Sequence, residues 1–115
     1  MSKDKTFFVT TTIYYINDVP HIGHAYTTIA ADILARYHRE VGDNTFFLTG
    51  LDENSQKTVL AAEKTGKDLK TYTDDLAKIW QETWEKLGIT HDDFIRTTET
   101  RHKKIVTEFF QKVLD

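Results

Sequence analysis

The chain contains no cysteine and one proline, and its charge shows no positive excess. Without cysteine, disulfides and thiolate metal sites are excluded from these 115 residues, as is usual for proteins of a reducing compartment. The 15 Lys and Arg residues against 18 Asp and Glu give a formal charge of −3. Overall charge therefore gives no sign of a nucleic-acid surface, and any main RNA-binding surface is expected to lie elsewhere.

Long hydrophobic runs are also missing. The apolar start is interrupted by Asp4 and by three consecutive threonines, and no small-residue cleavage site follows it. No segment approaches the roughly 20 apolar residues that cross a bilayer. With 39% hydrophobic, 12% aromatic and 29% charged residues, the composition is that of an ordinary globular domain. We expect a soluble, cytoplasmic protein that does not span a membrane.

Hydrophobic periodicity predicts alternating strands and helices. The β-branched and aromatic run 6–16 (TFFVTTTIYYI) predicts a buried strand, and Pro20 marks the loop after it. The remaining predicted elements are a helix at 23–41, a strand at 44–50, helices at 52–65 and 69–87, a short strand at 93–96 and a helix at 99–114. This order predicts an α/β fold built from βαβ units with a parallel sheet.

Helical stripes predict which faces are buried. In the helix 23–41 an apolar stripe repeats at three- and four-residue steps, with Asp32 and Arg36 on a wetter face. The stripe consists of Tyr26, Ile29, Ile33 and Tyr37. The predicted buried side of the helix 69–87 consists of Leu69, Tyr72, Leu76, Ile79, Trp80, Thr83 and Leu87. Trp80 and Trp84 are interpreted as packing residues without a further role.

Residues 20–24 (PHIGH) lie where the first predicted strand passes into the first helix. Ligands of open α/β sheets bind at this place, and the free N–H groups of a helix start favour anions. His21 and His24 are about one helical turn apart, so both rings can face one ligand and donate hydrogen bonds to phosphoryl oxygens. Gly23 would let a phosphate or a nucleobase approach the backbone closely.

Each candidate residue also has a structural interpretation. The two histidines could be surface residues of a helix start, and two ligands are too few for a metal site. Asp52 follows the second strand, where it could bind an ammonium group or cap the next helix. Asn17 alone would be a turn residue, and Ile13 and Tyr15 alone would be core residues of a strand.

Several ordered segments resemble one family. Residues 21–24 (HIGH) match the signature of the class I aminoacyl-tRNA synthetases, and segments 10–17 (TTTIYYIN), 25–28 (AYTT), 49–53 (TGLDE) and 92–98 (DDFIRTT) are similar to its methionyl branch. The similarity extends from about residue 6 to residue 114. It implies a Rossmann-like nucleotide-binding fold, of which residues 1–115 would be the first half, the N-terminal part of a catalytic domain.

The resemblance implies roles for the residues on the ATP side. His21 and His24 match histidines that bind ATP and stabilise the transition state in which the amino-acid carboxylate attacks the α-phosphate. Asn17 matches a residue that supports the same phosphate, and Gly23 matches the glycine against which adenine packs. Magnesium is expected to arrive bound to ATP, without a metal ligand in this segment.

The resemblance also implies a methionine site. Asp52 matches the carboxylate that holds the substrate's ammonium group. Ile13 and Tyr15 match positions lining the methionine site, one through its backbone and the other through its ring. The implied enzyme is a ligase that activates methionine with ATP and transfers it to tRNA.

Some family features differ or are missing. The family pattern TGTDEHG reads TGLDENS here, so Leu51, Asn54 and Ser55 depart from it, and Thr12 stands where proline is common. No lysine loop, connective insertion or anticodon-binding domain occurs in these residues, so we expect that the chain alone does not charge tRNA. Another nucleotidyl-transferring enzyme of the superfamily and a non-catalytic nucleotide-binding module remain alternatives. The sequence leaves the oligomeric state open.

Overall fold

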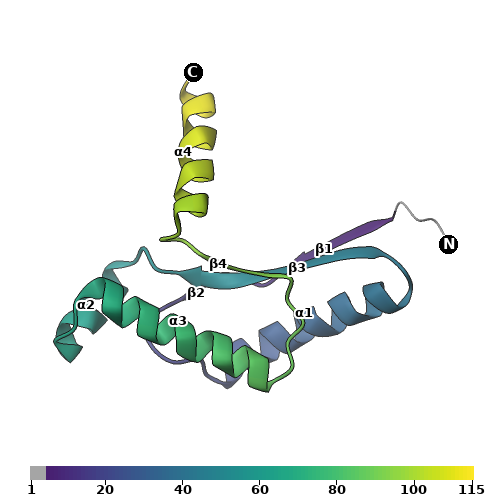
Figure 1. The fold of residues 1–115 in the computed structure, drawn as a ribbon, viewed down its shortest axis with the longest axis horizontal. Helices are drawn as coiled ribbons and strands as arrows, with labels where there is room; N and C mark the ends of the chain where they lie inside the picture. Colours follow the sequence, from purple (N-terminus) through teal and green to yellow (C-terminus); the bar gives the residue numbers. More distant parts are fainter. Residues whose placement is uncertain (1–4) are drawn as a thin grey trace.

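The computed structural model describes residues 5–115, which form one parallel sheet and a set of helices (Figure 1). In chain order the elements are β1 (Thr6–Thr10), β2 (Tyr14–Tyr15), α1 (Ile22–Glu40), β3 (Asn44–Asp52), α2 (Gln56–Thr65), α3 (Leu69–Lys86), β4 (Asp93–Arg96) and α4 (Thr100–Leu114). The predicted α/β fold with parallel strands and its order of helices and strands are confirmed. Within these residues no helix is long and apolar enough to cross a membrane.

β3 is the central strand, and every other strand of the sheet pairs with it in parallel. The carbonyls of Leu48 and Asp52 accept hydrogen bonds from the chain at β1 and β2, whereas those of Phe47 and Leu51 accept from the ends of β4. Because neighbouring carbonyls of a strand point to opposite edges, β1 and β2 lie along one edge and β4 along the other. The carboxyl ends of β2, β3 and β4 therefore meet at one end of the sheet.

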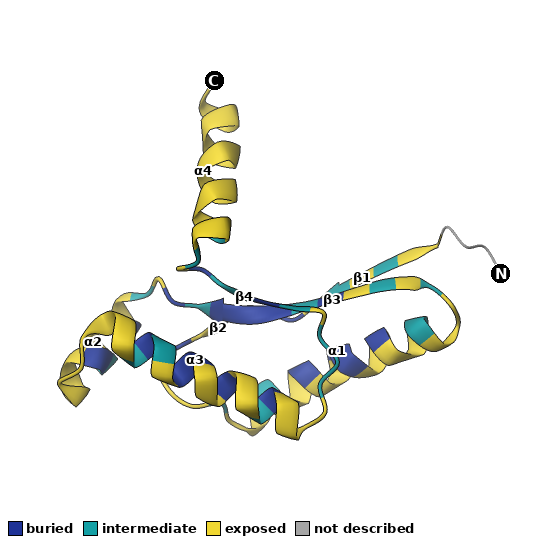
Figure 2. Ribbon diagram, viewed as in Figure 1, coloured by how far each residue is buried: buried dark blue, intermediate teal, exposed yellow. Residues whose placement is uncertain are grey.

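Both long helices α1 and α3 pack against the same face of the sheet (Figure 1). Buried positions follow the sides of these helices that face the strands and the middle of β3 (Figure 2). The larger core cluster, between α3 and the sheet, comprises Tyr14, Ile16, Leu51, Leu76, Ala77, Trp80, Trp84 and Phe94. A smaller cluster joins α1 to the sheet through Ala31, Ala35 and Phe47. On the opposite face of the sheet, Phe8 and Phe46 stack on each other and are exposed.

The predicted strand 6–16 is wrong as a single element, because residues 11–13 separate β1 from β2. The hydroxyl of Thr10 donates to the carbonyl of Thr11, and the hydroxyl of Thr11 donates to the carbonyl of Thr12, both at 2.7 Å. Threonine side chains that bond to nearby carbonyls compete with the hydrogen-bond ladder of a sheet. The chain therefore leaves β3 briefly before it returns as β2.

The prediction for the buried face of α1 is also wrong. The apolar stripe from Tyr26 to Tyr37 is exposed, and the buried residues are Thr28, Ala31, Asp32 and Ala35. Small side chains on this face let the helix approach the sheet closely. The Asp32 carboxylate accepts hydrogen bonds from the backbone and hydroxyl of Thr90 at 2.7 and 2.6 Å, and it pairs with Arg36 at 2.6 Å. These bonds compensate the burial of the Asp32 charge, which the sequence pattern places on the solvent-exposed side of the helix.

The buried side of α3 and the start of α2 also differ from the prediction. On α3, Leu76 and Trp80 are buried as predicted, but Leu69, Ile79 and Leu87 are exposed. The buried side of α3 is completed instead by Thr73, Ala77 and Trp84. The helix predicted from residue 52 begins at Gln56, because β3 extends to Asp52.

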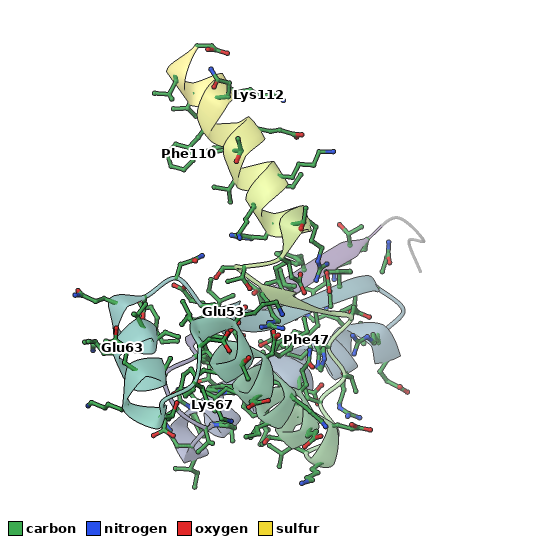
Figure 3. All side chains as sticks on the ribbon, turned by 60° about the vertical axis from the view of Figure 1, so that its left-hand side comes forward. Phe47, Glu53, Glu63, Lys67, Phe110 and Lys112 are labelled. Carbon is green, nitrogen blue, oxygen red and sulfur yellow. The ribbon has the colours of Figure 1, made fainter. Side chains whose placement is uncertain are left out.

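α4 extends away from the rest of the chain (Figure 1). None of its residues is buried, and its apolar side chains Ile105, Val106, Phe109, Phe110, Val113 and Leu114 are all exposed. Figure 3 shows the labelled Phe110 and Lys112 standing clear of the other elements. The predicted helix is confirmed, and its apolar face has no partner within residues 5–115.

Candidate active site

A hollow of about 920 Å³ opens at the carboxyl end of the sheet, between β2, the start of α1 and α3. Its lining residues are Thr12, Ile13, Tyr14, Tyr15, Asn17, Asp18, Val19, His21, His24, Asp52 and Trp80. Six of the seven candidate residues from the sequence are among them, and only Gly23 is not. The fold thus collects residues from positions 13 to 52 around one space large enough for a small ligand.

The two histidines cap the first turn of α1. His21 is the N-cap residue, and its Nδ1 accepts a hydrogen bond from the backbone N–H of Gly23 at 3.0 Å. In return, Nδ1 of His24 accepts from the backbone N–H of His21 at 3.1 Å. This is the reciprocal arrangement of a capping box, here made by two imidazoles. The rings are stacked, with their centroids 3.7 Å apart.

These hydrogen bonds determine the protonation of both rings. A ring nitrogen that accepts a hydrogen bond carries no proton, so each neutral imidazole holds its proton on Nε2. Burial lowers the pKa of His24, and the nearby His21 lowers it further. The lowered pKa favours the neutral form of His24, and the two hydrogen bonds to Nδ1 leave the Nε2–H of each ring free to donate. The site therefore offers two donors at a helix N-terminus, which suits an anionic ligand.

Gly23 is needed for the position of the His21 ring. A Cβ atom at this position would lie 2.8 Å from Cε1 and 3.1 Å from Nδ1 of His21, closer than ordinary contact. A larger residue would push the capping imidazole away from the helix. The structure thus gives Gly23 a role next to the hollow, and contact with adenine remains a prediction.

Asp52 ends β3, and its backbone lies beside that of Tyr15 in the sheet register. The interpretation of Asp52 as a helix cap is wrong, because Ser55 is the N-cap of α2 and its Oγ accepts from the N–H of Thr58 at 3.2 Å. One carboxylate oxygen of Asp52 accepts from the N–H of Asn54 at 3.0 Å. Among the described residues no cation pairs with this carboxylate in the hollow, so it can accept one from a ligand.

Ile13 and Tyr15 are not core residues of a strand, because their exposed fractions are 38% and 59%. Between them, Tyr14 is buried and its hydroxyl lies 2.9 Å from the hydroxyl of Thr28. The alternation at β2 thus places two exposed apolar side chains at the hollow and anchors the strand through the residue between them. Asn17 follows in an exposed loop and lines the hollow.

Trp80 lines the hollow although sequence reasoning gave it no functional role. It is fully buried, its ring lies 4.8 Å from that of His24, and its indole N–H donates to the carbonyl of Asp18 at 2.9 Å. No local pattern reveals this placement, since Trp80 comes from α3, more than 50 residues after the histidines. Among residues 5–115 no group of three or more His, Cys, Asp or Glu residues could hold a metal ion.

The departures from the family pattern take part in packing next to the site. Leu51 is fully buried in the core, Ser55 caps α2, and the side-chain amide of Asn54 lies 3.5 Å from the carbonyl of Thr97. Beside them, the buried Glu53 carboxylate binds Arg96 through two hydrogen bonds of 2.9 and 2.7 Å. This pair ties the end of β3 to the end of β4.

Comparison with known proteins identifies the family of the chain. The family model described as tRNA synthetases class I (M) matches residues 7–115. The chain thus belongs to the class I tRNA synthetases, in their methionyl group.

Individual relatives carry the corresponding name. The chain is 53% identical over 107 residues to the methionine–tRNA ligase of Thermotoga maritima, covering 93% of this chain and 17% of the relative. It is 52% identical to that of Halalkalibacterium halodurans, covering 100% of this chain and 18% of the relative. The structure of the Mycobacterium tuberculosis methionyl-tRNA synthetase in complex with methionyl-adenylate superimposes with a TM-score of 0.85 at 40% identity, covering 87% of this chain and 20% of that one. The chain thus spans about a fifth of the length of these proteins.

Proposed function

We propose that residues 1–115 are the N-terminal part of the catalytic domain of a methionine–tRNA ligase. The observation that carries this proposal is the grouping of two donor imidazoles and one carboxylate, which pairs with no cation among residues 5–115, around one hollow. Imidazole donors suit the phosphates of ATP, and a carboxylate suits an α-ammonium group. The relatives' names and the methionyl-adenylate in the solved neighbour support methionine as the amino acid.

The proposed reaction is a displacement at phosphorus. A carboxylate oxygen of methionine attacks the α-phosphate of ATP, the bond to the bridging oxygen of the β-phosphate breaks, and pyrophosphate leaves. The Nε2–H groups of His21 and His24 stabilise the negative charge that grows on the phosphoryl oxygens. Asn17, at the rim of the hollow, supports the same phosphate. Methionine is then transferred from the adenylate to tRNA.

The methionine site lies along β2. Asp52 holds the ammonium group, while Ile13 and Tyr15 contact the substrate from the edge of the sheet. Holding both reactants in one orientation supplies much of the rate enhancement in such a reaction. Magnesium bound to ATP would neutralise part of the phosphate charge. The tRNA is bound mainly by parts of the protein beyond this chain, and the enzyme acts in the cytoplasm.

The experiment that tests this function is methionine-dependent exchange of pyrophosphate into ATP by the full-length protein. Asp52→Asn removes the charge that holds the ammonium group, so the KM for methionine should rise by about 30-fold or more, while the KM for ATP stays within about twofold. Glu82→Gln, an exposed carboxylate on α3 paired with Lys78, is the control and should change neither constant. Exchange driven equally by other amino acids, or a matched rise in both constants for Asp52→Asn, would contradict the proposal.

A further inference from the structure

The loop between β2 and α1 carries Asn17 and leads directly into the capping His21. Residues 17–19 are exposed, and within the loop the N–H of Val19 is bonded to the side chain of Asp18 at 2.7 Å. Such a loop would be mobile if nothing held its backbone from outside. A phosphate-binding geometry needs the opposite, because small displacements of donors cost a large part of their effect.

Two side chains of α3 hold this loop. The indole N–H of Trp80 donates to the carbonyl of Asp18 at 2.9 Å, and the hydroxyl of Tyr72 donates to the carbonyl of Asn17 at 3.0 Å. The bond from Trp80 is partly buried and the one from Tyr72 is exposed. Because water competes less with a buried hydrogen bond, Trp80 is the stronger of the two anchors.

The ring of Trp80 also supports the other side of the hollow. Its centroid lies 5.4 Å from that of Tyr14, nearly parallel to it, and 4.8 Å from that of His24. One fully buried side chain therefore contacts β2, the loop and the first turn of α1 at once. No other described residue of α3 lines the hollow.

We propose that Trp80 is a positioning residue of the active site. It fixes the loop backbone through its N–H and supports the His24 ring through ring contact, so that Asn17, His21 and His24 keep one arrangement. This inference rests on the proposed function for its catalytic consequence, but its structural part does not depend on that function.

The chain contains a matched control for the hydrogen bond. Trp84, one turn further along α3, is also fully buried, but its indole N–H has no hydrogen-bond partner among residues 5–115. Trp80→Phe and Trp84→Phe therefore remove the same atoms from the same helix. Only the first change releases a carbonyl of the loop.

The test compares both variants in the full-length protein. For Trp80→Phe, kcat of methionine-dependent pyrophosphate exchange should fall by about tenfold, with the KM of both substrates within about threefold, as for the loss of one partly buried hydrogen bond. Hydrogen exchange in residues 17–24, measured by mass spectrometry, should become about fivefold faster. Trp84→Phe should leave kcat and this exchange within about twofold. Equal losses in both variants, or an unchanged kcat for Trp80→Phe, would overturn the proposal.

Two additional measurements separate a failure of the Trp80 proposal from a failure of the proposed function or of protein folding. If the wild-type protein shows no methionine-dependent exchange, the proposed function fails, and hydrogen exchange alone decides whether Trp80 fixes the loop. If Trp80→Phe does not fold, Tyr72→Phe loosens the same loop through an exposed bond without removing core volume. It should lower kcat and speed exchange in residues 17–24 in the same direction, by a smaller factor. A Tyr72→Phe protein identical to wild type in both measurements would then overturn the proposal.

Discussion

His21 uses its two ring nitrogens for different purposes, and substitution can separate them. Nδ1 caps α1 by accepting from the N–H of Gly23, whereas Nε2–H points away from the cap and is available to a ligand. In His21→Asn the amide oxygen occupies the place of Nδ1, so the cap remains and the distant donor is lost. In His21→Ala both are lost.

The size of each effect follows from these contacts. Losing an N-cap acceptor costs about 1 kcal/mol, which corresponds to about fivefold faster hydrogen exchange in the first turn of α1. Losing a donor to a charged phosphoryl oxygen costs about 1.5–3 kcal/mol, so adenylate formation should slow by roughly 10- to 150-fold. His21→Asn should therefore show only the second effect, and His21→Ala should show both.

The assays are hydrogen exchange of residues 21–26 and single-turnover formation of the adenylate by the full-length protein. Ser55→Ala is the reciprocal control, since Ser55 caps α2 and does not line the hollow. It should speed exchange at the start of α2 and leave adenylate formation unchanged. The reasoning is refuted if His21→Asn exchanges as fast as His21→Ala, or if it retains more than about half of the wild-type rate.

Two further predictions concern charge. Because the pKa of His24 is lowered in the fold, the unfolded chain binds its proton more readily, so this contribution to stability is complete above about pH 6.5 and is lost as the pH falls below that value. The first turn of α1 should exchange faster in acid, and His24→Asn, which keeps the cap acceptor, should remove this pH dependence. Separately, Glu53→Gln leaves Arg96 without its buried partner and should lower the free energy of unfolding by about 3 kcal/mol in urea titrations. Asp75→Asn, in an exposed pair with Lys67, should change it by less than about 0.5 kcal/mol, and equal effects would contradict the assignment.

The order of helices and strands was predictable because each element carries its own period and its own start and stop residues. Gly66 and Gly88 directly follow the predicted helices 52–65 and 69–87, and both adopt the left-handed backbone conformation that ends a helix. The buried face of α1 was not predictable in this way, since the largest apolar stripe, including Tyr26 and Ile33, is exposed. The sequence did not reveal the packed face, because the burial of Asp32 depends on a hydrogen bond from Thr90, which lies 58 residues away.

The candidate site was predictable to a similar extent. The strand-to-helix junction places His21 and His24 together through local geometry alone, and the parallel sheet brings Asp52 to the same end. Trp80 could not be found, because its contact with the loop depends on how α3 is placed over the sheet. The side of the hollow formed by α3 thus depends on long-range packing, which local sequence patterns do not show.

The position of the hollow along the chain has a consequence for how the protein is made. All lining residues but Trp80 lie within the first 52 residues, and β1, β2, α1 and β3 can associate as soon as these have left the ribosome. At that stage the loop before α1 has no support from α3. The binding surface is therefore complete only after α3 has also been synthesised and Trp80 can reach the loop.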